Sequence, residues 1–140
     1  MRASDVRTSI VAVVEAASVD AAAGARDRFV YVDTGGKELE QSPDRVFRCW
    51  LSVPPRRTTL FTLSAYEVEY TIDIHYAAVR NVDDRAAHDL EQVAYDLQTL
   101  NAQHADIMAA AIQPGSVLEM EHMIVARIPV LVTYRLTGVS

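Results

Sequence analysis

The sequence predicts an α+β domain in which a mostly antiparallel sheet of three to five strands packs against two helices. Residues 66–76 and 123–137 alternate between apolar and polar side chains, as strands with one buried face do. Residues 5–18 and 84–101 instead repeat apolar side chains at helical spacing. The chain has 140 residues, which is typical of one domain, so we expect a single domain over residues 1–140.

The composition excludes several classes of protein. Half of the residues are hydrophobic (50%) and 23% are charged, which indicates a folded core rather than a disordered acidic tail. The net charge of -6 argues against nucleic acid or an anionic membrane as the default partner. The single cysteine, Cys49, cannot form an internal disulfide. No apolar run of about 18 residues occurs, so we expect no transmembrane helix and no membrane partner.

The first part of the chain predicts a helix followed by short strands. The apolar stripe of the helix consists of Val6, Ile10, Val13, Val14 and Ala17. Residues 29–33 are rich in β-forming side chains, which favours a short strand.

Residues 45–53 predict a longer strand with Cys49 on the buried face and Trp50 on the opposite, wetter face. Pro54 and Pro55 cannot donate a backbone hydrogen bond, so the strand is expected to end there. Residues 54–65 are then expected to form a long loop.

The second half of the chain predicts a strand, a helix and a final strand. Residues 66–76 are expected to pair with the last strand, although the sequence leaves the strand order open. The helix over 84–101 is followed by residues 106–112, which are expected to add a helical turn. Pro129 interrupts the last strand, which indicates an edge position or a bulge.

The motifs of common catalytic sites are missing from the sequence. There is no phosphate-binding loop, no nucleophile elbow and no pair of histidines at i, i+4 spacing. Cys49 is interpreted as a packing residue. Residues 119–122 (EMEH) place two carboxylates beside an imidazole, but we interpret them as a solvated loop or the start of a strand rather than a metal site. The sequence therefore predicts no catalytic residue, no cofactor and no metal.

The charged residues of the strands suggest contacts between strands or between copies. The polar face of the long strand carries an acidic strip, formed by Glu67, Glu69, Asp73 and His75. Arg127 and Arg135 lie on the polar side of the last strand and are expected to pair with this strip or to meet it in a neighbouring copy.

The predicted loop over 54–65 is a candidate assembly arm. It begins with Arg56 and Arg57 and contains Phe61. Loops longer than about a dozen residues are often functional, and exposed aromatic residues such as Trp50 are enriched at interfaces. We therefore take Trp50, Arg56, Arg57 and Phe61 as candidate contact residues.

The order and the sequences of three of these segments resemble those of a known family. The segments are the alternating strand YEVEYTIDIHYA, the acidic helix DDRAAHDLEQVAYDL and the C-terminal strand RIPVLVTYRLTG. Together they resemble the tail terminator and tail completion proteins of long-tailed bacteriophages and gene transfer agents.

This resemblance implies a structural virion protein without catalytic activity. The implied assembly is a hexameric ring that caps the tail tube, ends its growth and joins it to the head connector or stopper protein. DNA would pass through the lumen without specific binding. The protein would be assembled in the host cytoplasm and lie in the tail-neck region of the virion.

Three alternatives stay open at this point, one of them a toxin–antitoxin or regulatory partner. Another neck or head-completion component would have a similar pattern. A small α+β ligand-binding domain or enzyme, with its ligand near Tyr70 and His75, belongs to a different class and would need a deep pocket with convergent polar groups.

Overall fold

The computed structural model describes residues 1–17, 29–32, 45–60, 63–77, 82–120 and 123–136. The helices are α1 (Ala3–Ala16), α3 (Val82–Leu97) and α4 (Leu100–Gln103). The strands are β1 (Phe29–Tyr31), β2 (Arg45–Leu60), β3 (Leu63–Ala77), β4 (Ile107–Ile112), β5 (Ser116–Met120) and β6 (Met123–Tyr134). None of the helices within these ranges is long and apolar enough to cross a membrane.

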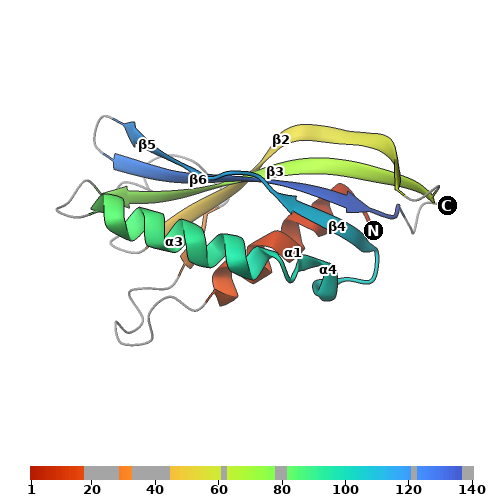
Figure 1. Cartoon of the computed structure of the whole chain (residues 1–140), viewed down its shortest axis with the longest axis horizontal. Coiled ribbons are helices and arrows are strands. Elements are labelled where there is room, and N and C mark those ends of the chain that lie inside the picture. The colour runs from red at the N-terminus through yellow and green to blue at the C-terminus, as the bar shows by residue number, and fades with distance from the viewer. Residues whose placement is uncertain (18–28, 33–44, 61–62, 78–81, 121–122, 137–140) are drawn as a thin grey trace.

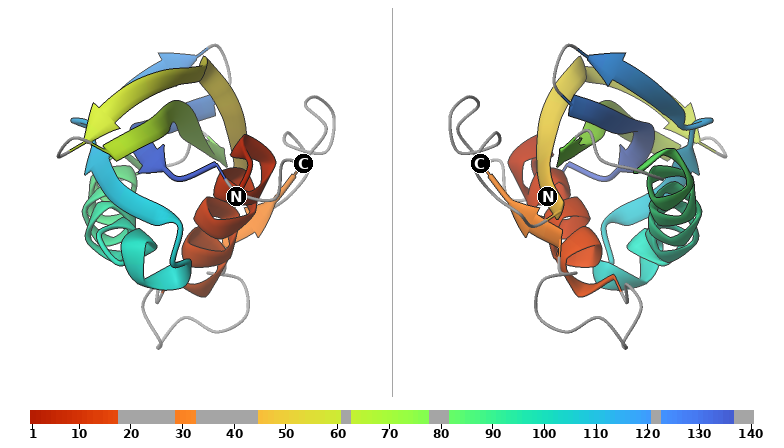
Figure 2. Two further views of the ribbon diagram at one scale, coloured as in Figure 1. Left: turned by 90° about the vertical axis from the view of Figure 1, so that its right-hand side faces the viewer. Right: turned by 90° about the vertical axis from the view of Figure 1, so that its left-hand side faces the viewer.

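The helices and the sheet form two layers, which confirms the α+β prediction (Figure 1). The six strands have the order β1-β2-β3-β6-β4, and β5 pairs with the other end of β6. Among the strand pairs of the described residues, only β1–β2 is parallel. β3 and β6 pair as expected, from Tyr66 opposite Tyr134 to Ala77 opposite Met123. Viewed along the strands, the sheet curves over α1 and α3, which lie on the same side of it (Figure 2).

The core lies between the sheet and these two helices. All of the stripe predicted for α1 is buried except Ala17, which is half-buried just beyond the helix. Most of the apolar residues that α3 repeats at helical spacing are also buried. β3 and β6 bury every second side chain between the layers, including Ile72, Ile128 and Tyr134. The hydroxyl of Tyr76 donates to the buried Asp89 of α3 at 2.5 Å, so the sheet and helix are also joined by a polar contact inside the core.

The expected loop over 54–65 is wrong, because β2 continues to Leu60 and pairs with β3 to the pair Leu60–Leu63. The pairing shifts register between Leu51 and Val53 and again between Val53 and Arg56. Pro54 and Pro55 lie within the second shift. A β-bulge interrupts the ladder locally, so prolines without an N–H can be accommodated there without ending the strand. We call residues 54–60 and 63–66 the β2–β3 arm.

Residues 107–112 form β4 and not the expected helical turn. The helical part ends earlier, with α3 and the one-turn α4. The alanine-rich segment is drawn into the sheet by its pairing with β6, from Ile107 opposite Tyr134 to Ile112 opposite Val130. This pairing outweighs the weak intrinsic preference of alanine for strands.

Pro129 occupies neither an edge strand nor a bulge, because β6 lies between β3 and the β4/β5 pair. Its carbonyl accepts a hydrogen bond from the backbone N–H of Gln113 at 2.9 Å. The nitrogen of a strand residue points to the same side as its carbonyl. Here that side is the break between Ile112 and Ser116, so no ladder hydrogen bond is lost.

Candidate functional site

The sheet face that points away from the helices carries a compact charged group, which we call the Trp50–Asp73–Arg127 cluster. Arg127 donates through Nε to Asp73 Oδ1 at 2.8 Å and through Nη2 to Oδ2 at 3.1 Å. Trp50 Nε1 donates to the same Oδ2 at 2.9 Å, and the Arg127 guanidinium lies 5.6 Å from the centre of the indole ring. Asp73 is only 5% exposed. Its carboxylate is thus held by three donors from the two neighbouring strands.

This cluster confirms part of the predicted pairing between strands. Asp73 lies directly opposite Arg127 in the ladder, and the hydrogen bonds to this carboxylate raise the pKa of Arg127. Arg135, in contrast, follows the end of β6, and among the described residues no ion pair joins its exposed side chain to the acidic strip. Its backbone N–H donates to the carbonyl of Asp106 at 2.8 Å.

The other members of the acidic strip also have partners within the chain. Glu67 forms an ion pair with Arg56 across the β2–β3 arm. Glu69 Oε1 accepts from Ser52 Oγ at 2.7 Å, and Thr71 Oγ1 donates to Ser52 Oγ at 2.8 Å. These carboxylates stabilise the sheet and do not converge on a shared cavity.

Tyr70 and His75 do not form the ligand site considered from the sequence, because they lie on opposite faces of β3. Tyr70 is 2% exposed and donates to the carbonyl of Ala3 at 3.0 Å. His75 Nδ1 lies 3.3 Å from Met123 Sδ on the outer face. Burial lowers the pKa of His75, and the nearby Asp73 opposes this effect.

Acidification is expected to destabilise the protein through His75. In the unfolded chain His75 takes up a proton near its ordinary pKa of 6.5, while the folded imidazole, with its lowered pKa, stays neutral. The contribution of neutral His75 to the free energy of unfolding is therefore complete above pH 6.5. It is lost as the pH falls through the lower pKa of the folded state. Urea unfolding at a series of pH values should show that acidification lowers the free energy of unfolding less for His75→Gln than for wild type. His88→Gln, at an exposed position of α3, is the control, and equal losses for all three proteins would contradict this expectation.

The β2–β3 arm presents two exposed arginines. Arg56 is paired with Glu67 but is still largely exposed, at 62% of its side chain. Arg57 lies opposite Tyr66 and is exposed, and it makes no ion pair with any residue of the described ranges. Trp50 is not on the arm but in the cluster at its base. Phe61, the fourth predicted contact residue, lies outside the described residues.

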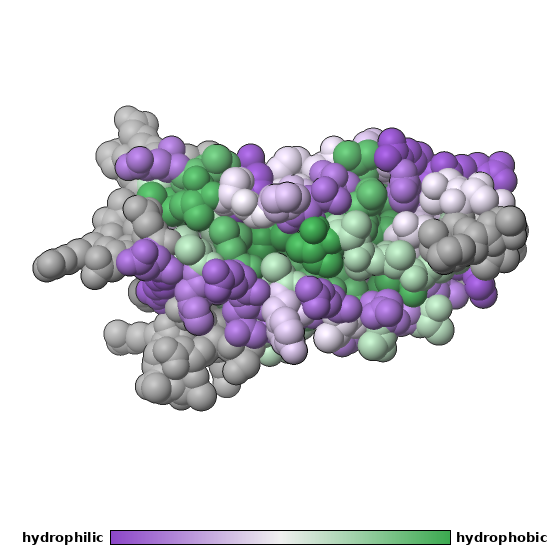
Figure 3. Space-filling view, viewed as in Figure 1, coloured by the Kyte–Doolittle hydropathy of each residue, from purple (hydrophilic) through white to green (hydrophobic). Residues whose placement is uncertain are grey.

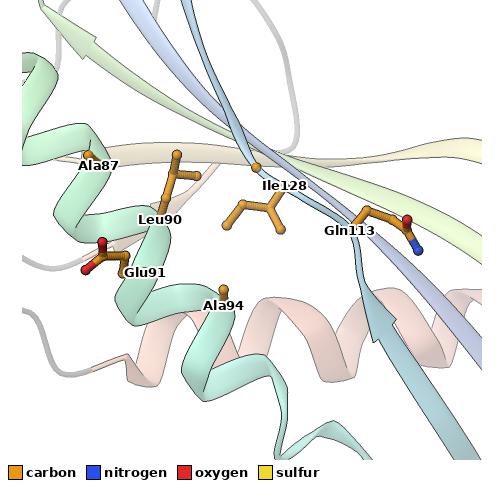
Figure 4. Close-up of a pocket in the computed structure, with 7 residues that line it drawn as sticks. Ala87, Leu90, Glu91, Ala94, Gln113 and Ile128 are labelled. Atoms are coloured by element: carbon orange, nitrogen blue, oxygen red, sulfur yellow. The ribbon is translucent and has the colours of Figure 1, made fainter.

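Sequence reasoning missed an apolar groove between α3 and the junction of β4 with β5. The groove has a volume of about 270 Å³ and is lined mainly by Leu90, Ala94 and Ile128, with Glu91 on the helix side and Gln113 on the strand side (Figure 4). Tyr95, on the outer face of α3, is 68% exposed. Tyr95 does not line the groove itself, whose residues come from separate parts of the chain and carried no sequence signal.

Cys49 is buried as predicted, and burial raises the pKa of its thiol to about 12. A thiol with such a pKa is a poor nucleophile near neutral pH. We expect a thiol reagent such as iodoacetamide to leave the folded protein unmodified at pH 8 and to modify one cysteine after denaturation. Mass spectrometry before and after adding guanidinium measures this, and rapid modification of the native protein would contradict the burial of Cys49.

No group of three potential metal-ligating residues occurs within the described ranges. Glu119 lies exposed on β5, while residues 121 and 122 of the EMEH segment are outside the described residues. The comparisons with known proteins add no assignment: no family model matches the chain, and no curated protein matches it.

Proposed function

We propose that this chain is a structural subunit that assembles into a ring at the end of a phage-like tail tube, as its resemblance to tail terminator proteins implies. The observation that carries the proposal is the β2–β3 arm, which extends past the helical layer (Figure 1). An isolated two-stranded ribbon is marginally stable in water, so a projecting arm is suited to docking on another subunit.

The distribution of polar side chains also supports a role in assembly. The acidic residues of the outer sheet face are paired with residues of neighbouring strands. The groove beside α3, of about 270 Å³, and a second hollow beside β1, of about 300 Å³, are both open and lie at or below the lower end of the range of about 300–1,000 Å³ typical of small-molecule sites. These features favour a protein that acts through contacts between surfaces.

In this proposal the ring is a hexamer with the tail tube protein on one face and the head connector or stopper on the other. Such a ring needs a contact between two different surfaces of the subunit, repeated until it closes. The net charge of -6 would limit adhesion of DNA passing through the lumen. Assembly would take place in the host cytoplasm, and the finished ring would lie in the tail-neck region.

Native mass spectrometry over a range of concentrations tests this proposal. We expect a closed species of six times 15.5 kDa, either alone or after addition of purified tail tubes. A stable dimer as the only assembly would contradict the proposal, because a two-fold contact closes on itself without forming a ring. A monomer that is also not retained by tail tubes would contradict it as well.

The double variant Arg56→Ala/Arg57→Ala should fold normally but fail to assemble. Both side chains are exposed, so the unfolding free energy should change by less than about 1 kcal/mol. Loss of two arm charges should reduce ring formation at least tenfold, as measured by native mass spectrometry. Arg2→Ala, another exposed arginine, is the matched control. Normal assembly of the double variant would show that the two arginines of the arm do not contribute to the interface.

A further inference from the structure

We infer that the groove beside α3 receives the β2–β3 arm of a neighbouring copy, with Arg57 of one subunit against the acidic outer face of α3 in the next. This inference rests on the proposed ring function and names the two surfaces that would build the ring. It assigns the groove to a second copy of this chain.

The groove has the character of a docking surface. Its floor is apolar, with Leu90 and Ile128 between α3 and the sheet (Figure 4). Figure 3 shows an apolar band across the middle of this face, with hydrophilic side chains below it. Glu91 and Tyr95 are neighbours on the outer face of α3, one helical turn apart, and Tyr95 is 68% exposed. Tyr95 directly follows the groove-lining Ala94 in the chain, and aromatic residues are enriched at interfaces.

Gly115 brings the strand junction close to the helix at this groove. A Cβ atom at this position would lie 3.3 Å from a methyl carbon of Leu90 and 3.3 Å from the carbonyl oxygen of Arg127. The chain between β4 and β5 therefore passes tightly against Leu90 of α3 at the wall of the groove. A preformed surface loses little conformational entropy when a partner docks.

The charges of the two surfaces are complementary. The sequence of α3 contains five acidic residues and one arginine, and Asp84 and Glu91 among them are exposed. Residues 54–66 contain two arginines and no acidic residue. Arg57 is exposed and makes no ion pair with other described residues, so it is available to a carboxylate of another subunit. Opposite charges across an interface steer association and select the partner.

The two surfaces lie at different places on the subunit, as a ring requires. In Figure 1 the arm ends at the right, beyond α1, whereas α3 runs below the left half of the sheet. The arm is held in this direction by its pairing with the rest of β2 and β3. Contact between the arm of one copy and the groove of the next therefore uses two different patches, and such a contact can repeat around a ring.

Cysteine cross-linking tests the contact directly, because the only native cysteine is buried. We expect a short bismaleimide to convert the Arg57→Cys/Glu91→Cys variant into a ladder of covalent oligomers. A mixture of the two single variants should give covalent dimers only, because each copy then contributes one reactive thiol. Cross-linking of Arg57→Cys alone to itself would overturn the inference, since it would place two arms together. A double variant that forms rings but no cross-links would also overturn it.

Charge exchange provides an independent test. Arg57→Glu and Glu91→Arg are each expected to weaken ring formation at least tenfold, and the two substitutions together should restore it. Arg2→Glu and Glu119→Arg, at exposed positions outside the two surfaces, are the matched controls and should assemble normally. Rings from either single variant at the wild-type concentration would overturn this inference and leave the ring function standing. A wild-type chain that never assembles would overturn both.

Discussion

Replacement of Phe47 by alanine is expected to lower the free energy of unfolding by about 4 kcal/mol. Phe47 is fully buried in β2, and its ring centre lies 5.5 Å from that of Tyr31 in β1. The substitution removes a large apolar side chain and leaves a cavity that a sheet paired on both sides of β2 cannot readily close. Urea unfolding followed by circular dichroism measures the loss.

Leu51→Ala, on the same strand, is the matched control for this substitution. Leu51 is 41% exposed and follows Phe47 by four residues, so its removal should change the unfolding free energy by less than about 1 kcal/mol. Equal losses for both variants would contradict the placement of the core between the sheet and the helices.

Replacement of Asp73 by alanine should cost about 3 kcal/mol, because it leaves a partly buried guanidinium without its carboxylate. Arg127 loses both hydrogen bonds to the carboxylate, and Trp50 loses the acceptor of its indole N–H. We place the loss at the lower end for a broken buried pair because the side chain of Arg127 is 33% exposed. The unfolding free energy in urea is the quantity to measure.

A double-mutant cycle separates the ion pair from general damage to the sheet. Arg127→Met alone should also destabilise the protein, but the two substitutions together should cost less than the sum, because neither charge is then left without its partner. Asp84→Ala, an exposed carboxylate on α3, should have little effect. Additive losses in the cycle would mean that Asp73 and Arg127 contribute independently of each other.

The strands and helices with one buried face could be predicted because burial leaves a period in the sequence. β3 and β6 alternate as expected, and the ion pair between Asp73 and Arg127 follows from placing polar residues on the same face of paired strands. The same reasoning failed for Arg135, which lies beyond the last ladder pair. The polar face of β3 is also more buried than expected. Asp73 and Thr71 are buried there, in a hydrogen-bonded network that residue spacing does not reveal.

Elements that depend on pairing rather than on burial were missed. Two consecutive prolines usually end a strand, but here Pro54 and Pro55 lie within a register shift, where the ladder is already interrupted. The alanine-rich β4 has little strand preference of its own and depends on β6. The groove beside α3 combines residues from three separate parts of the chain, 87–94, 113–115 and 128, so no local sequence motif predicts it.

The two register shifts lie just before and at the start of the arm, and they give the two paired strands different lengths. From Leu51 to Leu60 the chain of β2 advances nine residues, whereas the paired part of β3, from Leu63 to Tyr70, advances seven. The longer strand must bulge and bend to stay in step with the shorter one, and bulges increase the local twist. The curvature of the arm is therefore specified by residue count within the hairpin itself. A free subunit already has this curvature, so the arm does not have to change shape when it contacts a neighbouring copy.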